Sequence, residues 1–174
     1  MQFVCDEGFI IKRRNYGEAD RILTIFSKEN GKITVIAKGV RKITSRRGGL
    51  LEPFNLVKFN TVQSYFMKIL TEVVLKSSFE SHKADLNSYK KILIVCELVD
   101  ALCAEDVKVK NLYDNVLNLA YGLGKYDSLL DFKTDLLVNL GYWNNDKKFA
   151  TDNDSYRYIE SIIERKLKSR TINF

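Results

Sequence analysis

The stretch DRILTIFSKENGKITVIA, residues 20–37, decides the fold. Residues 20–27 are rich in β-branched side chains and partly alternate between apolar and polar, and residues 33–40 continue in the same way. Asn30-Gly31 stands between the two runs, and this dipeptide is a strong local signal for a β-hairpin. The stretch therefore predicts two antiparallel strands joined by a tight turn.

The rest of the first half also has strand character. Residues 8–14 and 54–59 are short apolar runs, and residues 62–76 are long enough for one bent strand or two. Pro53, the sole proline, precedes its strand, where a missing N–H is tolerated. About five short strands joined by turns predict a small closed barrel, with an OB-fold as the natural candidate for a nucleic-acid-binding domain over residues 1–80.

The second half changes to helical periodicity. Apolar residues recur at spacings of three and four, which places them on one face of a helix. The predicted helices span residues 85–103, 111–123, 127–140 and 155–168. The chain is thus expected to be α+β, with a helical domain over residues 81–174. Because no long linker separates the halves, we expect the helices to pack against the barrel.

A dense cationic segment follows the predicted hairpin. Residues 38–49 hold five positive charges, no acidic residue and three glycines. The pattern indicates a mobile loop whose side chains can follow successive phosphates, although a solvated basic surface loop is the alternative. The predicted phosphate contacts in this loop are Lys38, Arg41, Lys42, Arg46 and Arg47.

The charge distribution favours the binding interpretation. Residues 1–80 carry 14 basic and 8 acidic residues, and residues 81–174 carry 14 of each, so the net charge of +6 lies in the first half. A second basic group extends the predicted surface: Arg13, Arg14 and Arg21. Tyr16 lies between them in a turn, and we expect it to be exposed for base stacking. Most of the other aromatic residues of the barrel are expected in its core.

Several function classes are disfavoured. The three cysteines form no C-x-x-C pair and the only histidine is His82, so we expect no disulfide framework, no metal site and no cofactor. Phosphate-binding glycine motifs and a nucleophile elbow are absent from the sequence, so an enzyme is not expected. No apolar run reaches membrane-spanning length and the N-terminus has no signal-peptide pattern, so a location inside the cell is the expectation.

The order of the motifs resembles the RecO family of bacterial recombination mediators. The match runs through residues 11–27, Gly31-Lys32, residues 37–41 and residues 45–54, and more loosely through residues 89–101, 132–142 and 167–170. Many relatives carry a four-cysteine zinc module after the position of Gly141-Tyr142. Here residues 143–154 contain no cysteine, so we expect a short form without zinc.

The resemblance implies a non-catalytic role in DNA repair. Members bind single- and double-stranded DNA, anneal complementary strands, pair with RecR and help RecA load on DNA coated by the single-strand-binding protein SSB. This implies a cytoplasmic, nucleoid-associated protein. The acidic, apolar-tipped tail of SSB docks on the helical domain, and three cationic groups here could rim such a groove: Lys90/Lys91, Lys108/Lys110 and residues 165–170.

Two alternatives remain open from the sequence. The basic half could dock an acidic protein and contact nucleic acid only incidentally. The barrel could also bind RNA, because its predicted cations and aromatic residues do not distinguish RNA from DNA.

Overall fold

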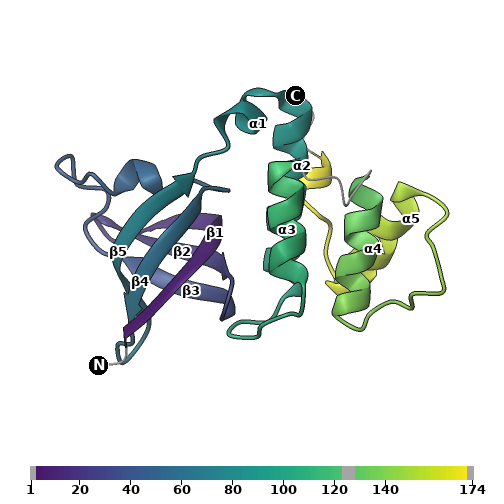
Figure 1. Ribbon diagram of the computed structural model, residues 1–174, viewed down its shortest axis with the longest axis horizontal. Coiled ribbons are helices and arrows are strands. Elements are labelled where there is room, and N and C mark those ends of the chain that lie inside the picture. The colour runs from purple at the N-terminus through teal and green to yellow at the C-terminus, as the bar shows by residue number, and fades with distance from the viewer. Residues whose placement is uncertain (1–2, 123–127, 172–174) are drawn as a thin grey trace.

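The first half of the chain is a closed five-stranded barrel, to one side of which the helices pack (Figure 1). The computed structural model describes residues 3–122 and 128–171. The strands are β1 (Phe3–Tyr16), β2 (Asp20–Ser27), β3 (Gly31–Ala37), β4 (Leu56–Val62) and β5 (Lys68–Ser77). Their order around the barrel is β1-β2-β3-β5-β4, and β3 and β5 alone run parallel. The predicted OB-fold is confirmed.

The predicted hairpin is confirmed by the pairing of β2 with β3. Ser27 lies opposite Gly31 and Ile22 opposite Ile36. Gly31 has φ +68°, and a Cβ there would stand 2.0 Å from the Val107 carbonyl oxygen. Only glycine fits this turn, because the chain after α2 passes directly over it.

Two strand boundaries differ from the sequence prediction. β3 ends at Ala37 rather than at residue 40, because Gly39 turns the chain with φ +69°. β4 begins at Leu56, three residues after Pro53, since Phe54 has a positive φ of 63° that no strand accepts. Residues 62–76, predicted as one bent strand or two, contain only the end of β4 at Val62 and most of β5, which begins at Lys68.

β1 closes the barrel because it pairs with two neighbours at once. Its first half pairs with β4 and its second half with β2, and both ladders include Gly8 and Phe9. A Cβ on Gly8 would come within 2.7 Å of the Phe26 carbonyl oxygen, so a larger residue would push β2 away. The register shifts between Ile10 and Lys12, and such a bulge bends a strand and increases its twist.

Barrel strands that face the helices are buried on both sides. Ile10 points into the barrel core with Leu23 and Ile25, whereas its neighbours Phe9 and Ile11 join the core of the helical half. At this junction Tyr113 lies with its ring centroid 5.9 Å from that of Phe9 and donates its hydroxyl to Glu7 Oε1 at 3.0 Å. The helices therefore pack against the barrel, as predicted.

The helical half contains α1 (Glu80–Ala84), α2 (Leu86–Leu102), α3 (Leu112–Tyr121), α4 (Leu129–Asn139) and α5 (Asp152–Ile162). Three of these match predicted helices closely, although the predicted ends at residues 123 and 127 lie outside the described residues. α5 begins earlier than predicted because Thr151 and Asp154 form a capping box. None of the described helices is long and apolar enough to cross a membrane.

The loop between α4 and α5 is closed by aromatic rings. Trp143 stacks on Phe149 with a centroid separation of 4.1 Å and meets the edge of Tyr158 at 4.8 Å. The indole Nε1 donates to the Lys147 carbonyl at 2.8 Å. This cluster gives the sole tryptophan a fixed environment in the helical half, far along the chain from the cationic loop.

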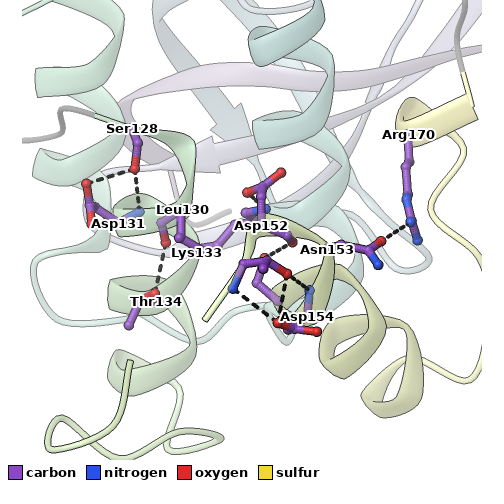
Figure 2. Close-up of polar contacts among 11 residues, drawn as sticks. Ser128, Leu130, Asp131, Lys133, Thr134, Asp152, Asn153, Asp154 and Arg170 are labelled. Carbon is purple, nitrogen blue, oxygen red and sulfur yellow. Dashed lines mark hydrogen bonds and ion pairs between the residues drawn. The ribbon is translucent and has the colours of Figure 1, made fainter. Parts of the chain in front are cut away.

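A buried lysine joins α4 to α5. The Lys133 side chain is fully buried, pairs with Asp152 and lies 3.5 Å from the centre of the Tyr156 ring. Figure 2 shows this pair beside the Ser128 cap of α4, where Asp131 N–H donates to the Ser128 hydroxyl. Burial lowers the pKa of Lys133, and the Asp152 carboxylate acts in the opposite direction.

Removing the carboxylate is expected to cost more than removing the lysine. Asp152→Asn leaves a buried cation without its counter-charge and should lower the free energy of unfolding by about 2 kcal/mol. Lys133→Met keeps most of the buried volume and leaves Asp152, which is 54% exposed, in contact with water. Urea denaturation followed by Trp143 fluorescence measures both, and a larger loss for Lys133→Met would contradict this ranking.

The same lysine makes stability depend on pH. Its folded pKa lies below the unfolded value, so the unfolded chain binds more protons between the two values. The stability of the native chain relative to Lys133→Met should therefore rise as the pH increases toward 10.5. Urea titrations at about pH 7, 8.5 and 10 test this direction. A stability difference between the native chain and Lys133→Met that falls as the pH rises would contradict it.

Candidate nucleic-acid interface

The cationic loop, residues 38–49, is held against the turn between β1 and β2. Gly39 N–H donates to Asp20 Oδ1 at 2.7 Å, and Arg41 N–H donates to the Ala19 carbonyl at 2.9 Å. Further turns within the loop are closed by bonds from Lys42 to Gly39 and from Ser45 to Lys42. The predicted loop is therefore present, and it is anchored at its base rather than freely suspended.

Four of the predicted cations project from this surface. Lys38, Lys42, Arg46 and the strand residue Arg14 are exposed. Within residues 3–122 and 128–171, none of these four side chains has a hydrogen-bond or ion-pair partner. Arg41 is also exposed and donates to the Gly17 carbonyl at 3.0 Å. Exposed cations without a counter-ion are best placed to bind phosphates, because no internal ion pair has to be broken first.

Arg47, another predicted phosphate contact, has hydrogen-bond partners within the protein. Its guanidinium turns inward, where it donates to the Lys38 carbonyl at 2.9 Å and to the Thr71 carbonyl on β5 at 3.1 Å. These bonds connect the two ends of the loop and fasten it to the barrel. Sequence reasoning grouped Arg47 with the phosphate contacts, and the geometry makes it a brace for the loop that carries them.

Arg13 and Arg21, two further predicted phosphate contacts, have an acidic partner within the barrel domain. Both converge on Glu52, with Arg13 Nη1 paired directly to its carboxylate and Arg21 Nη1 at 3.9 Å. Arg21 donates in addition to the Gly48 carbonyl at 3.2 Å. The acidic partner Glu52 lies in the chain just after the loop, so the sequence around Arg13 and Arg21 gave no sign of it. Their charges are partly compensated within the barrel.

Exposed rings lie at two places on the barrel. Tyr16, at the end of β1, is 52% exposed, as predicted. Sequence reasoning placed most other barrel aromatics in the core and therefore missed Tyr65 and Phe66, which are 92% and 90% exposed in the β4–β5 loop. The polar pair Gln63-Ser64 before them could have predicted this exposure, because it interrupts the strand pattern.

Nothing in this arrangement forms a metal centre. Across the described ranges, no three His, Cys, Asp or Glu side chains are placed to hold a metal ion. The His82 ring lies at the edge of the Phe79 ring, with centroids 6.1 Å apart. Cys96 and Cys103 are buried, and burial raises the pKa of their thiols to about 12 and about 11.

The comparison with known proteins decides the family. Residues 1–79 match the family described as recombination protein O, N terminal. The barrel of this chain belongs to the RecO family. The resemblance predicted from the sequence is thus confirmed, and the matched residues end where β5 gives way to α1.

Relatives named DNA repair protein RecO extend the similarity beyond the barrel. The one from Bifidobacterium adolescentis is 34% identical over 102 residues, 58% of this chain and 42% of that protein. The one from Clostridium perfringens is 30% identical over 147 residues, 82% of this chain and 60% of that protein. The chain spans about half the length of the curated relatives it matches.

One solved structure is similar at a low level. A chain of the S. pombe Stn1-Ten1 complex aligns with a TM-score of 0.35 and 13% identity, over 56% of this chain and 77% of that chain. The OB-fold assignment rests instead on the strand order and on the RecO match of residues 1–79.

A second site lies where the barrel meets the helical half. A groove of about 510 Å³ separates β1 from α2 and the C-terminal segment. Its floor includes Ile11, Leu93 and Cys96. The cations of its rim are partly paired, because Lys12 contacts Asp100 at 2.7 Å and Arg165 contacts Glu97 at 3.0 Å. Of the predicted rim residues, Arg165, Lys168 and Ser169 line this groove.

Arg47 and Arg46 provide a matched pair of variants for the RecO barrel. Arg47→Ala removes two hydrogen bonds from a charged group and should lower the free energy of unfolding by about 1–2 kcal/mol. Arg46→Ala removes the same charge from an exposed side chain and should change it by less than about 0.5 kcal/mol. Urea denaturation followed by circular dichroism compares them, and equal stabilities would contradict the bracing role.

Proposed function

We propose that this chain is a non-catalytic DNA-binding recombination mediator. In this proposal it binds and anneals single strands at the barrel and assists RecA loading on SSB-coated DNA together with RecR. The observation that carries the proposal is the set of exposed, unpartnered cations on a loop of a RecO-family barrel. A protein of this function works on the chromosome, in the cytoplasm.

The geometry suits annealing because the cations project from a loop rather than line a closed channel. Two strands that carry like charges repel each other until their phosphates are neutralised, and the bases have to stay accessible for pairing. Lys38, Lys42 and Arg46 can neutralise phosphates from one side only, which leaves the bases accessible. Arg14 extends the same charge onto β1.

The salt dependence of binding tests this surface. Contacts with about four to six phosphates predict a log–log slope of about −3 to −4 on single strands. The triple variant Lys38→Ala, Lys42→Ala, Arg46→Ala should reduce that slope by about 2 and weaken binding at least tenfold at moderate salt (an order-of-magnitude figure). Fluorescence anisotropy of a labelled strand of about 30 nucleotides, with an annealing assay on its complement, measures both effects.

The matched control removes three exposed lysines from the helical half: Lys91, Lys110 and Lys148. It lowers the net charge equally and should leave both slope and annealing rate near native values. Equal losses in the two triple variants would show a general charge effect and contradict the assigned surface. Competition with an RNA strand of the same sequence distinguishes the RNA-binding alternative, and divalent-metal-dependent cleavage would contradict a non-catalytic role.

The groove between β1 and α2 supports a protein partner. We propose that it receives the acidic, apolar-tipped tail of SSB, because its floor is apolar and its rim carries Lys12, Arg165 and Lys168. An entering carboxylate would share these cations with Glu97 and Asp100, which lie on the same rim.

A charge placed in the floor tests this partner. Leu93→Asp should weaken binding of a labelled acidic peptide with an apolar tip by at least tenfold (an order-of-magnitude figure), since it replaces an apolar contact with a like charge. Leu86→Asp makes the same change on an exposed part of α2 and should leave binding intact. Loss in both variants, at equal thermal stability, would contradict the groove as the docking site.

A further inference from the structure

One apolar side chain stands in solvent within the cationic loop. Ile43 is fully exposed (104%), so nothing in the described part of the chain covers it. It is the second residue of a tight turn over residues 42–45, which is closed by the Ser45 N–H donating to the Lys42 carbonyl at 2.8 Å. The isoleucine therefore lies at a corner of the loop, with its whole side chain available to a ligand.

Local preference does not account for an isoleucine at this corner. Exposed turns favour Gly, Pro, Asn, Asp and Ser, because these residues fit the backbone angles of a turn or bond to its backbone groups. A β-branched apolar residue favours the half-buried surface of a strand instead. Residues that conflict with their local setting are expected at functional sites, so Ile43 is a candidate for a role in binding.

Two unpaired cations flank this side chain along the loop. Lys42 comes directly before Ile43 and Arg46 three residues after it, and both side chains are exposed. Single exposed apolar residues are common on protein surfaces, but here the apolar group and the charges belong to one short turn. A polyanion that binds Lys42 and Arg46 is thereby brought into contact with Ile43.

The base of the loop fixes the position of the turn. Gly39 N–H donates to Asp20 Oδ1 on one side, and Arg47 donates to the Thr71 carbonyl of β5 on the other. Figure 1 shows the loop extending from the barrel on the side away from α4 and α5. The turn is therefore held on a support, and those two helices leave its approach to DNA open.

An apolar group between cations suits the minor groove of duplex DNA. This groove is about 6 Å wide, and many proteins that bind there insert one apolar side chain, often Ile, Leu, Phe, Met or Pro, between neighbouring base pairs. An anionic membrane surface also attracts cations, but stable anchoring there needs a larger apolar area than one side chain provides. The observations therefore favour DNA as the occupant.

We propose that Ile43 is a wedge that enters duplex DNA from the minor groove and partly unstacks two neighbouring base pairs. The wedge deepens the proposed DNA-binding function and rests on it. The side chain exchanges water for the apolar faces of the bases, while Lys42 and Arg46 bind the phosphates beside it. Single strands form short internal duplexes before they anneal, and unstacking these duplexes at flexible steps frees their bases for the complementary strand.

Fluorescence of 2-aminopurine measures the wedge, because this base brightens when it loses its stacked neighbours. The probe is a duplex with one TA step, which kinks easily, and with 2-aminopurine in place of an adenine of that step. Saturating native protein should raise the fluorescence at least about twofold (an order-of-magnitude figure). Ile43→Ala should remove most of this rise, and Ile43→Leu should keep it.

Two controls separate insertion from charge and from general truncation. Ile43→Ala keeps every cation, so the slope of its affinity for duplex DNA against salt should equal the native slope. Val107→Ala shortens a β-branched side chain that is 50% exposed in the loop between α2 and α3, and it should leave the fluorescence rise at its native size. A duplex with a stiff A-tract in place of the TA step should give a smaller rise. Because both side chains are exposed, the variants should keep native thermal stability.

Several results would overturn the wedge. A native fluorescence rise with Ile43→Ala would do so, as would an equal rise on the A-tract duplex. If Ile43→Ala instead reduces sedimentation with vesicles of phosphatidylcholine and phosphatidylserine, and leaves the fluorescence rise unchanged, the side chain belongs to a membrane contact. If the triple variant of the loop cations weakens DNA binding and Ile43→Ala leaves the rise intact, the wedge fails and the proposed function stands. If the native protein binds no DNA at low salt, both fail.

Discussion

The structure depends on the double pairing of β1. A single strand of 14 residues bonds to β4 with its first half and to β2 with its second half, which is possible only because it bends between them. The bend needs glycine at position 8, where any side chain would meet β2, and a register shift after Ile10. Closing the barrel in this way brings the β1–β2 turn beside the loop that follows β3.

The same strand joins the two halves of the chain. Phe9 and Ile11 leave the barrel on the side of α2 and α3, whereas Ile10 stays inside. The outer face of a barrel strand can contact water, but here the helices cover the outer face of β1 at Phe9 and Ile11. The cationic loop projects from the part of the barrel that lies away from α4 and α5 (Figure 1). Packing and charge are thus separated between opposite sides of the same barrel.

Local patterns in the sequence predicted most of the fold. The Asn30-Gly31 hairpin and the helical faces of α2 and α4 are set by neighbouring residues, so periodicity and turn chemistry were sufficient to find them. The parallel contact of β3 with β5 is different, because two short register pairs distant in the chain define it. The positive φ of Phe54 likewise depends on tertiary packing and was not visible in the sequence.

The sequence predicted the positive charge of the candidate site but not how its side chains are arranged. Sequence reasoning located the cationic loop, yet only the structure shows that Arg47 turns to Thr71 and that Glu52 pairs with Arg13. These partners lie far from one another in the chain. The exposure of Tyr65 and Phe66 was not predicted. Within a strand, one of two neighbouring side chains points into the core, but β4 ends before either residue.

Hydrogen exchange of backbone amides, measured with and without a single strand of 30 nucleotides (roughly the span of several OB-fold sites), tests the central claim most directly. The account predicts slower exchange in residues 38–49, and unchanged exchange in α4 and α5. Protection confined to α2 and the C-terminal segment, with none in the cationic loop, would contradict it.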